Sequence, residues 1–201
     1  MIFAEWKPID ELVEKLKAYD KVLLVGCATC VAECAAGGEK EVETLAPLLT
    51  MALKKAGYTV EITTATREKQ CEGEFVEELA EKVNGVDAVL SIACGIGIQA
   101  MAERFDPKPV YPCVNTSALT IREEDGVWAG RCAACGDCIL GLTGGICPIA
   151  RCAKQLLNGP CGGSQDGICE IDPDTLCAWQ LIYDRLKAQD RLHLLEEIQP
   201  A

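Results

Sequence analysis

Cysteine is the residue that most constrains this chain, because 14 of its 201 residues are cysteine and only one is histidine. The densest runs are "GCATCVAEC" at 26–34 and "CAACGDC" at 132–138. The start, "MIFAEWKPIDELVEKL", does not have the basic lead and long apolar stretch of a secretory signal. We therefore expect a cytoplasmic protein, whose thiols stay reduced and bind metal rather than form disulfides.

The composition narrows the range of partners. The formal net charge is -12, and a field of that sign repels phosphate backbones, so we expect no nucleic-acid partner. No apolar stretch approaches the length of a membrane span. Apolar residues make up 49% of the chain, which is enough for one or two domains with cores of their own.

The first part of the chain alternates short apolar runs with helical patterns. Strands are predicted at 21–27, 58–65, 87–95 and 108–115, and helices at 7–20, 41–57, 74–85 and 97–105. Pro47 predicts a kink or a late start in the second of these helices. Alternation of this kind is typical of an α/β fold, and we predict a flavodoxin-like parallel sheet with flanking helices over 1–121.

The remainder, 122–201, is rich in glycine, cysteine and proline. Such a stretch cannot build an apolar core by pattern alone, so we expect a metal-organised, cysteine-rich region. Within it we predict one helix over 147–159 that ends at Gly159, and a second over 172–198 with Asp172 as its cap and Pro173 in its first turn.

The first group of cysteines follows the ends of the predicted strands. Cys27 and Cys94 end two strands, and Cys71 lies in the loop after another. Carboxyl ends of parallel strands share one edge of a sheet, so these thiols should converge there. Cys30 and Cys34 follow Cys27 at a helix start. Cys113, near the end of the fourth strand, is as well explained as a plain buried thiol.

The spacing in this group favours a [4Fe–4S] cluster over zinc. Structural zinc sites usually pair two tight CxxC units, whereas here a CxxC and a CxxxC are followed by distant single residues. A thioredoxin-like redox pair, Cys27 with Cys30, is the bland alternative. It leaves Cys34, Cys71 and Cys94 unexplained.

The second group has the spacing CxxCxxC followed by Cys-Pro. In bacterial ferredoxins the last gap is three residues, but here it is eight, so the ligand assignment stays open. Two clusters, or one cluster with spare or zinc-binding thiols, would fit. The members of the group are Cys132, Cys135, Cys138, Cys147, Cys152, Cys161, Cys169 and Cys177. Cys177 lies on an apolar helix face, where a structural thiol is at least as plausible as a ligand.

Four segments together resemble one family, over nearly the whole chain. They are "GCATCVAECAAGGEKEVETLA", "REKQCEGEF", "ACGIGIQ" and "CPIARCAKQLLNGPCGGSQDGICE". The family is the cysteine-rich accessory subunit of methylenetetrahydrofolate reductase, which also occurs as a C-terminal domain of that enzyme and is often labelled zinc-binding. The chain has no room for the flavin-binding barrel of the catalytic subunit.

The resemblance implies a non-catalytic electron-transfer subunit with two or more [4Fe–4S] clusters. It would pass electrons to or from the flavin of a partner catalytic subunit, which reduces 5,10-methylene- to 5-methyltetrahydrofolate in the reductive acetyl-CoA pathway, and further redox subunits could supply the electrons. The implied cluster ligands are Cys27, Cys30, Cys34, Cys71, Cys94, Cys132, Cys135, Cys138, Cys147, Cys152, Cys161 and Cys169.

Two alternatives to electron transfer remain open at this point. In the first, the chain is a zinc-binding structural subunit that braces the flavoprotein, with the zinc site among Cys132, Cys135, Cys152, Cys161 and Cys169. In the second, it is an independent thiol oxidoreductase that depends on Cys27. The first group also offers five candidates for four cluster positions, so one of them is spare, and Cys30 ranks last.

Overall fold

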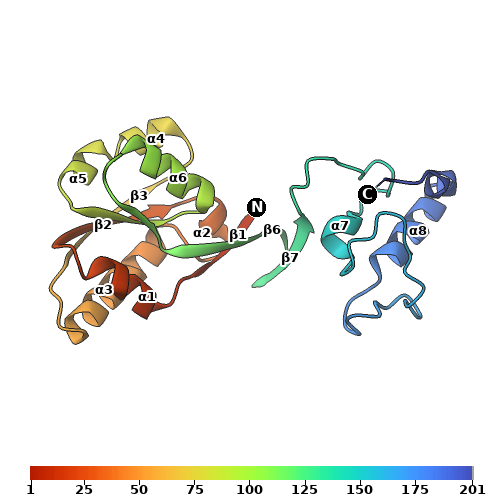
Figure 1. The fold of residues 1–201 in the computed structure, drawn as a ribbon, viewed down its shortest axis with the longest axis horizontal. Coiled ribbons are helices and arrows are strands. Elements are labelled where there is room, and N and C mark those ends of the chain that lie inside the picture. Colours follow the sequence, from red (N-terminus) through yellow and green to blue (C-terminus); the bar gives the residue numbers. More distant parts are fainter. Residues whose placement is uncertain (201) are drawn as a thin grey trace. The chain divides into compact units, whose positions relative to one another are not determined.

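The computed structural model describes residues 1–200, and the chain divides into two units, Met1–Ser117 and Ala118–Ala201. The first unit contains a four-stranded parallel sheet (Figure 1). Its strands are β2 (Lys21–Cys27), β3 (Glu61–Arg67), β4 (Ala88–Ile92) and β5 (Val110–Pro112). The predicted α/β class with a parallel sheet and flanking helices is confirmed.

The strand order β3-β2-β4-β5 explains where a site can form. The chain goes from β2 outward to β3, then returns to the other side of β2 to add β4 and β5. The connection therefore reverses direction between β2 and β4. In open parallel sheets, ligands bind in the crevice at the carboxyl ends of the strands at such a reversal.

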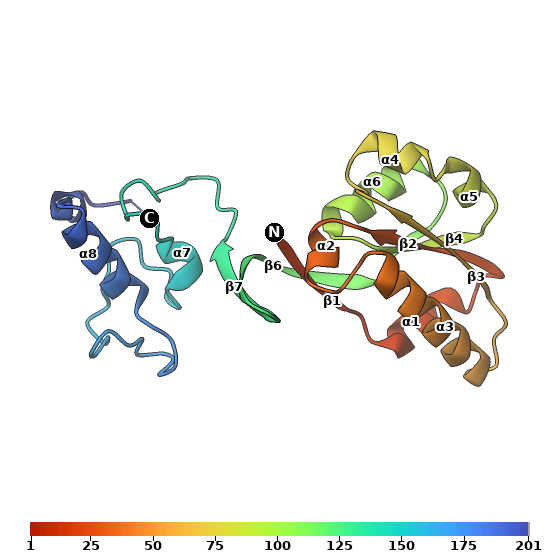
Figure 2. The same cartoon turned by 180° about the vertical axis from the view of Figure 1, so that it is seen from behind.

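Helices cover both faces of this sheet, as the two opposite views show (Figures 1 and 2). On one face lie α1 (Ile9–Leu16) and α3 (Glu39–Lys55), and on the other α4 (Gly73–Glu77), α5 (Ala80–Asn84) and α6 (Gly95–Arg104). Successive residues of β2 serve the two faces in turn: Val22 and Leu24 join the first core, Leu23 and Val25 the second. Both pairs are fully buried, as expected of a central parallel strand.

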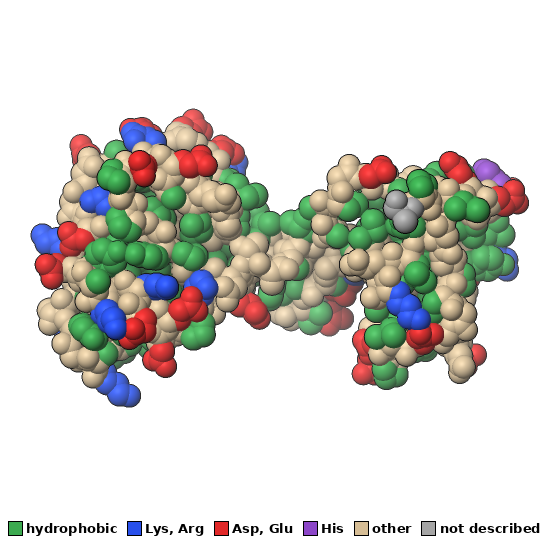
Figure 3. All heavy atoms as spheres, viewed as in Figure 1, with side chains coloured by type: hydrophobic (Ala, Val, Ile, Leu, Met, Phe, Trp, Pro, Cys, Tyr) green, Lys and Arg blue, Asp and Glu red, His purple; other side chains and the backbone are tan. Residues whose placement is uncertain are grey.

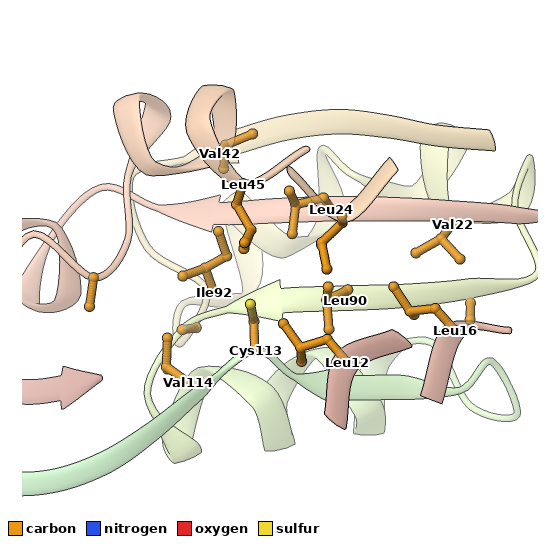
Figure 4. Packing of buried hydrophobic residues seen from close by; sticks show 14 of the residues in the cluster. Leu12, Leu16, Val22, Leu24, Val42, Leu45, Leu90, Ile92, Cys113 and Val114 are labelled. Atoms are coloured by element: carbon orange, nitrogen blue, oxygen red, sulfur yellow. The ribbon is translucent and has the colours of Figure 1, made fainter. Parts of the chain in front are cut away.

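One consequence of this packing is visible around Cys113. Its thiol is fully buried between the sheet and α1, among Leu12, Leu90 and Val114 (Figure 4).

Pro47 lies inside α3 but neither delays nor ends this helix, which runs without a break from Glu39 to Lys55. Of the two alternatives predicted from Pro47, a kink or a late start, the late start was wrong. Buried residues on both sides of the proline, Leu45 and Leu49, hold the helix against the sheet.

A second, three-stranded sheet has the order β1-β6-β7 and was not predicted. It consists of β1 (Ile2–Trp6), β6 (Val114–Glu124) and β7 (Val127–Cys132). β6 spans the division between the two units and pairs antiparallel with β7. The turn between them places Gly126 at φ 80°, a left-handed conformation that glycine adopts without strain.

The C-terminal unit has little regular structure beyond this hairpin. It contains α7 (Pro148–Arg151), α8 (Ala178–Ala188) and the 3-10 helix η1 (Leu192–Glu196). A small core forms where Ile146, Trp179, Ile182 and Leu186 are buried together. Regular helix thus accounts for a short part of the unit, and loops that carry cysteines make up most of the rest.

Both helices predicted for this unit were too long. The one predicted over 147–159 stops at Arg151, and Gln155 lies in the left-handed region with φ 52°. The last helix begins at Ala178 rather than after Asp172. Asp172 instead closes a local turn, in which its carboxylate accepts hydrogen bonds from the Asp174 N–H and the Thr175 hydroxyl.

Charged side chains of both signs are intermingled on the visible face of the N-terminal unit (Figure 3). Among the described residues, no helix combines the length and apolar character that crossing a bilayer requires.

Candidate functional site

Three cysteines of the N-terminal unit lie at the carboxyl ends of β2, β3 and β4, where the sheet reverses direction. Cys27 is the last residue of β2, and Cys94 is the residue that precedes α6. Cys71 lies in the exposed loop between β3 and α4. We call Cys27, Cys71 and Cys94 the switch-point thiols. Their placement at the carboxyl edge of the sheet is the one that the strand-end argument predicted.

The pKa of Cys71 depends on the two other switch-point thiols. Burial raises the pKa of Cys71, and the negative charges that Cys27 and Cys94 carry when ionised raise it further. Ionisation of Cys71 is therefore unfavourable beside an ionised Cys27 or Cys94.

Cys30 and Cys34 flank the one-turn helix α2 (Cys30–Glu33). The Cys34 thiol donates to the Val31 carbonyl at 3.4 Å and to the Ala4 carbonyl at 3.6 Å, and it packs against the core. Its hydrogen-bond partners are therefore carbonyls rather than the switch-point thiols. Cys30 is half-buried at the start of α2, three residues after Cys27.

Cys113 is separated from these thiols by its burial. Its side chain is fully enclosed, and burial raises the pKa of the thiol to about 12. A thiol so hard to ionise is a poor metal ligand, because the thiolate is the form that binds metal. Of the two interpretations that the sequence left open, the plain buried thiol is the one that fits this environment.

In the C-terminal unit, four cysteines line one pocket of about 200 Å³, which we call the hairpin pocket. They are Cys132, Cys135, Cys138 and Cys147. Cys132 ends β7 and Cys147 immediately precedes α7, so the hairpin and the helix hold the two outer positions. The loop between them turns through left-handed residues at Ala134 and Gly136, with φ values of 52° and 89°. The Ala134 N–H donates to the Cys132 sulfur at 3.4 Å.

Four further cysteines line a second, much smaller cavity of about 20 Å³, which we call the tight pocket. They are Cys152, Cys161, Cys169 and Cys177. Antiparallel backbone bridges join Ile168 to Gln165 and to Leu176, so the chain folds back on itself here. The second bridge places Cys169 and Cys177 on neighbouring segments. The Cys169 N–H donates to the Thr175 carbonyl, and the Cys177 N–H donates to the Gly167 carbonyl.

Cys177 is the member of this group that the sequence did not single out as a ligand. It immediately precedes α8 and is 9% exposed. Burial raises its pKa, but hydrogen bonds from the Ser164 hydroxyl and from the N–H groups of Gln180 and Trp179 outweigh burial, so the pKa lies below its ordinary value. The sequence placed Cys177 in a helical pattern, but it did not predict that Cys177 lines a pocket with three cysteines distant in the chain.

Charged neighbours complete the wall of the tight pocket. Lys154 and Glu170 form an ion pair there, and the Cys161 thiol lies 3.6 Å from the Glu170 carboxylate. Lining a common pocket is a weaker condition than coordination. In the part of the chain that the structure describes, no three Cys, His, Asp or Glu side chains stand at the mutual distances that hold a metal ion.

The fold and these pockets define the class of protein as an α/β protein with a cysteine-rich C-terminal unit. Residues 111–201, which include both the hairpin pocket and the tight pocket, match a family described as "Methylene-tetrahydrofolate reductase C terminal". The match supports a relationship between this chain and methylenetetrahydrofolate reductase. Neither a search of curated proteins nor a search of solved structures found a match.

Proposed function

We propose that the chain is an iron–sulfur electron-transfer subunit that works with the flavin-dependent catalytic subunit of methylenetetrahydrofolate reductase. The observation that carries the proposal is the gathering of thiols from distant segments into separate groups. Packing alone gives cysteines no reason to collect in this way, whereas thiolates are the ligands that iron–sulfur clusters require. The match over residues 111–201 supplies the link to the folate enzyme.

At the edge of the parallel sheet, the switch-point thiols would supply three ligands of a cluster. The fourth position falls to Cys30 or Cys34. The Cys34 thiol already donates to two carbonyls on the side of the core, so we assign the fourth position to Cys30. This assignment differs from the sequence-based order, in which Cys30 ranks last.

The hairpin pocket would hold a second cluster on Cys132, Cys135, Cys138 and Cys147. Its volume of about 200 Å³ leaves room for a group of several atoms. Both outer ligands are held by regular structure, while the two inner ones lie on a loop that can adjust around a bound group. The four side chains present are the donor set of a [4Fe–4S] cluster.

The tight pocket favours a different occupant. Its volume of about 20 Å³ is room for about one water-sized particle, hence for a single ion rather than a cluster. Four cysteines around one ion are the donor set of structural zinc. We therefore retain zinc here as a brace of the C-terminal unit, on Cys152, Cys161, Cys169 and Cys177, beside electron transfer through the other two groups.

A bound cluster would supply one-electron chemistry, and the protein's own part is to hold and tune it. Donation from the Ala134 N–H to sulfur lowers the electron density there, which makes reduction easier. Cys27 is buried, and its thiol donates to the Glu68 carbonyl at 3.8 Å, in the loop that carries Cys71. Electrons would leave the chain for the flavin of the partner, in the cytoplasm, and a further redox subunit would supply them.

The proposal is tested by mixing the chemically reduced full chain, purified without oxygen, with the flavin-containing catalytic subunit. We expect rapid bleaching of the flavin absorbance with the wild-type chain and with Cys113→Ala, and slow bleaching with Cys138→Ala. Equal rates for all three chains would refute electron transfer through the hairpin pocket. A colourless wild-type chain that contains zinc alone and stabilises the catalytic subunit would instead establish the structural role.

A further inference from the structure

Gln70, the residue before Cys71, has a fully buried amide side chain. Its Nε2 donates to the Val25 carbonyl at 3.1 Å, and its Oε1 accepts from the Ser91 hydroxyl at 2.6 Å. Val25 and Ser91 are register partners on the adjacent strands β2 and β4. One side chain therefore ties the loop after β3 to both strands that flank the reversal of the sheet.

These are the strands that lead to the other two switch-point thiols. Cys27 follows Val25 by two residues, and Cys94 follows Ser91 by three. A buried amide is costly unless its donor and acceptor are both used, and here each has a partner. An apolar side chain at position 70 could be buried at a lower desolvation cost. It would make no hydrogen bonds to β2 and β4, so it would not fix the position of the loop relative to the strand ends.

The helix α6 also packs closely against Gln70. A Cβ atom added at Gly97 would lie 2.9 Å from the Ala93 Cβ and 3.1 Å from the Gln70 Cβ. The first turn of α6 therefore approaches Gln70 more closely than any side chain at position 97 permits. Gln70 is enclosed by β2, β4 and α6, the elements that carry or adjoin Cys27 and Cys94.

We propose that Gln70 is a positioning residue whose two hydrogen bonds hold Cys71 beside Cys27 and Cys94, so that the three thiols act as one ligand set. The role of the set in binding iron rests on the proposed function above. The positioning itself is a property of the protein without metal, and it can be measured there.

The test uses the full chain prepared without iron, in reducing buffer, and a short bifunctional thiol reagent such as dibromobimane. Peptide mapping by mass spectrometry then reports which cysteines have been joined. In the wild-type chain we expect Cys71 to be linked to Cys27 or Cys94. In Gln70→Leu, which removes both hydrogen bonds at similar volume, the yield of these links should fall by about tenfold, that is, by about threefold for each of the two bonds.

Two controls separate positioning from general stability. Gln99→Leu makes the same change at an exposed side chain of α6, and Val83→Ala removes buried volume from α5 without touching the loop. Both should retain the wild-type yield of the links. Should Gln70→Leu not fold, Ser91→Ala removes one of the two bonds and is expected to lower the yield by about threefold.

An unchanged yield in folded Gln70→Leu or Ser91→Ala, or no link to Cys71 in the wild-type chain, would overturn the positioning role. After reconstitution with iron and sulfide, the Gln70 variant should also show an altered electron paramagnetic resonance signal. A wild-type chain that cross-links as expected but takes up no iron would overturn the proposed function and leave the positioning intact.

Discussion

Replacing Cys113 by alanine should change how the stability of the protein depends on pH. The thiol is fully enclosed in the core formed by α1, α3 and the parallel sheet. Burial raises its pKa from the ordinary 9.0 to about 12, and the nearby Lys7 opposes this by a smaller amount. An unfolded chain can therefore ionise Cys113 at a pH at which the folded chain cannot.

The sign and size of the effect follow from these two pKa values. Between them the unfolded state binds fewer protons than the folded state, so stability falls as pH rises above 9. At pH 7 the contribution is nil, and at pH 10 it amounts to a loss of between about 1 and 2 kcal/mol. The loss grows until the folded thiol itself ionises near pH 12.

The assay is urea unfolding of wild type and Cys113→Ala at pH 7 and pH 10, without oxygen and with a reductant present. The other 13 cysteines are common to both proteins, so the difference between the two pH-dependent losses isolates Cys113. We expect the wild-type chain to lose between about 1 and 2 kcal/mol more than the variant. Equal losses in the two proteins would refute the assignment of Cys113 as a buried, un-ionised thiol.

The remaining predictions concern packing in the two units. Gly159→Ala would place a Cβ within 2.2 Å of the Trp179 ring, so unfolding followed by intrinsic fluorescence should show the C-terminal unit destabilised by about 1–3 kcal/mol. An unshifted transition would contradict that close contact. Leu90→Ala deletes a fully buried side chain of β4 and should cost about 2–5 kcal/mol in urea unfolding. Leu48→Ala, at a side chain that is 36% exposed, is the control and should stay within about 0.5 kcal/mol of wild type.

The sequence predicted the parallel sheet and its thiol-bearing edge because both follow from local pattern plus topology. Apolar runs fix the strands, and parallel strands joined by helices leave their carboxyl ends on one edge. Cys27 and Cys94 follow the adjacent strands β2 and β4, and Cys71 follows β3 on the other side of β2, so all three lie at this edge. The sequence did not predict the buried position of Gln70, because an isolated glutamine in a polar loop is expected to be exposed.

Prediction failed where the chain departs from periodic pattern. The pair Asp125–Gly126 between two β-rich runs is a hairpin signal, but the glycine and cysteine that surround it obscure the strand pattern. The helix expected after Pro173 is prevented by the backbone bridge from Ile168 to Leu176. That bridge joins residues eight positions apart, a pairing that neither helical nor strand periodicity indicates.

The spacing of the C-terminal cysteines in the sequence also did not predict which of them line the same pocket. A gap of eight residues separates Cys138 from Cys147, yet both line the hairpin pocket. Cys177 lies in an apolar helical pattern, yet it lines the tight pocket with three others. In both cases the conformation of the loops decides which cysteines line one pocket. Loops have no periodic sequence pattern from which that conformation could be predicted.

The central claim is that the gathered thiols hold iron, and the most direct measurement is the iron, sulfide and zinc content per folded chain, purified without exposure to oxygen. Our account predicts iron and sulfide in equal amounts, lost from the hairpin pocket in Cys138→Ala and retained in Cys113→Ala. A folded wild-type chain that contains neither iron nor sulfide would contradict it.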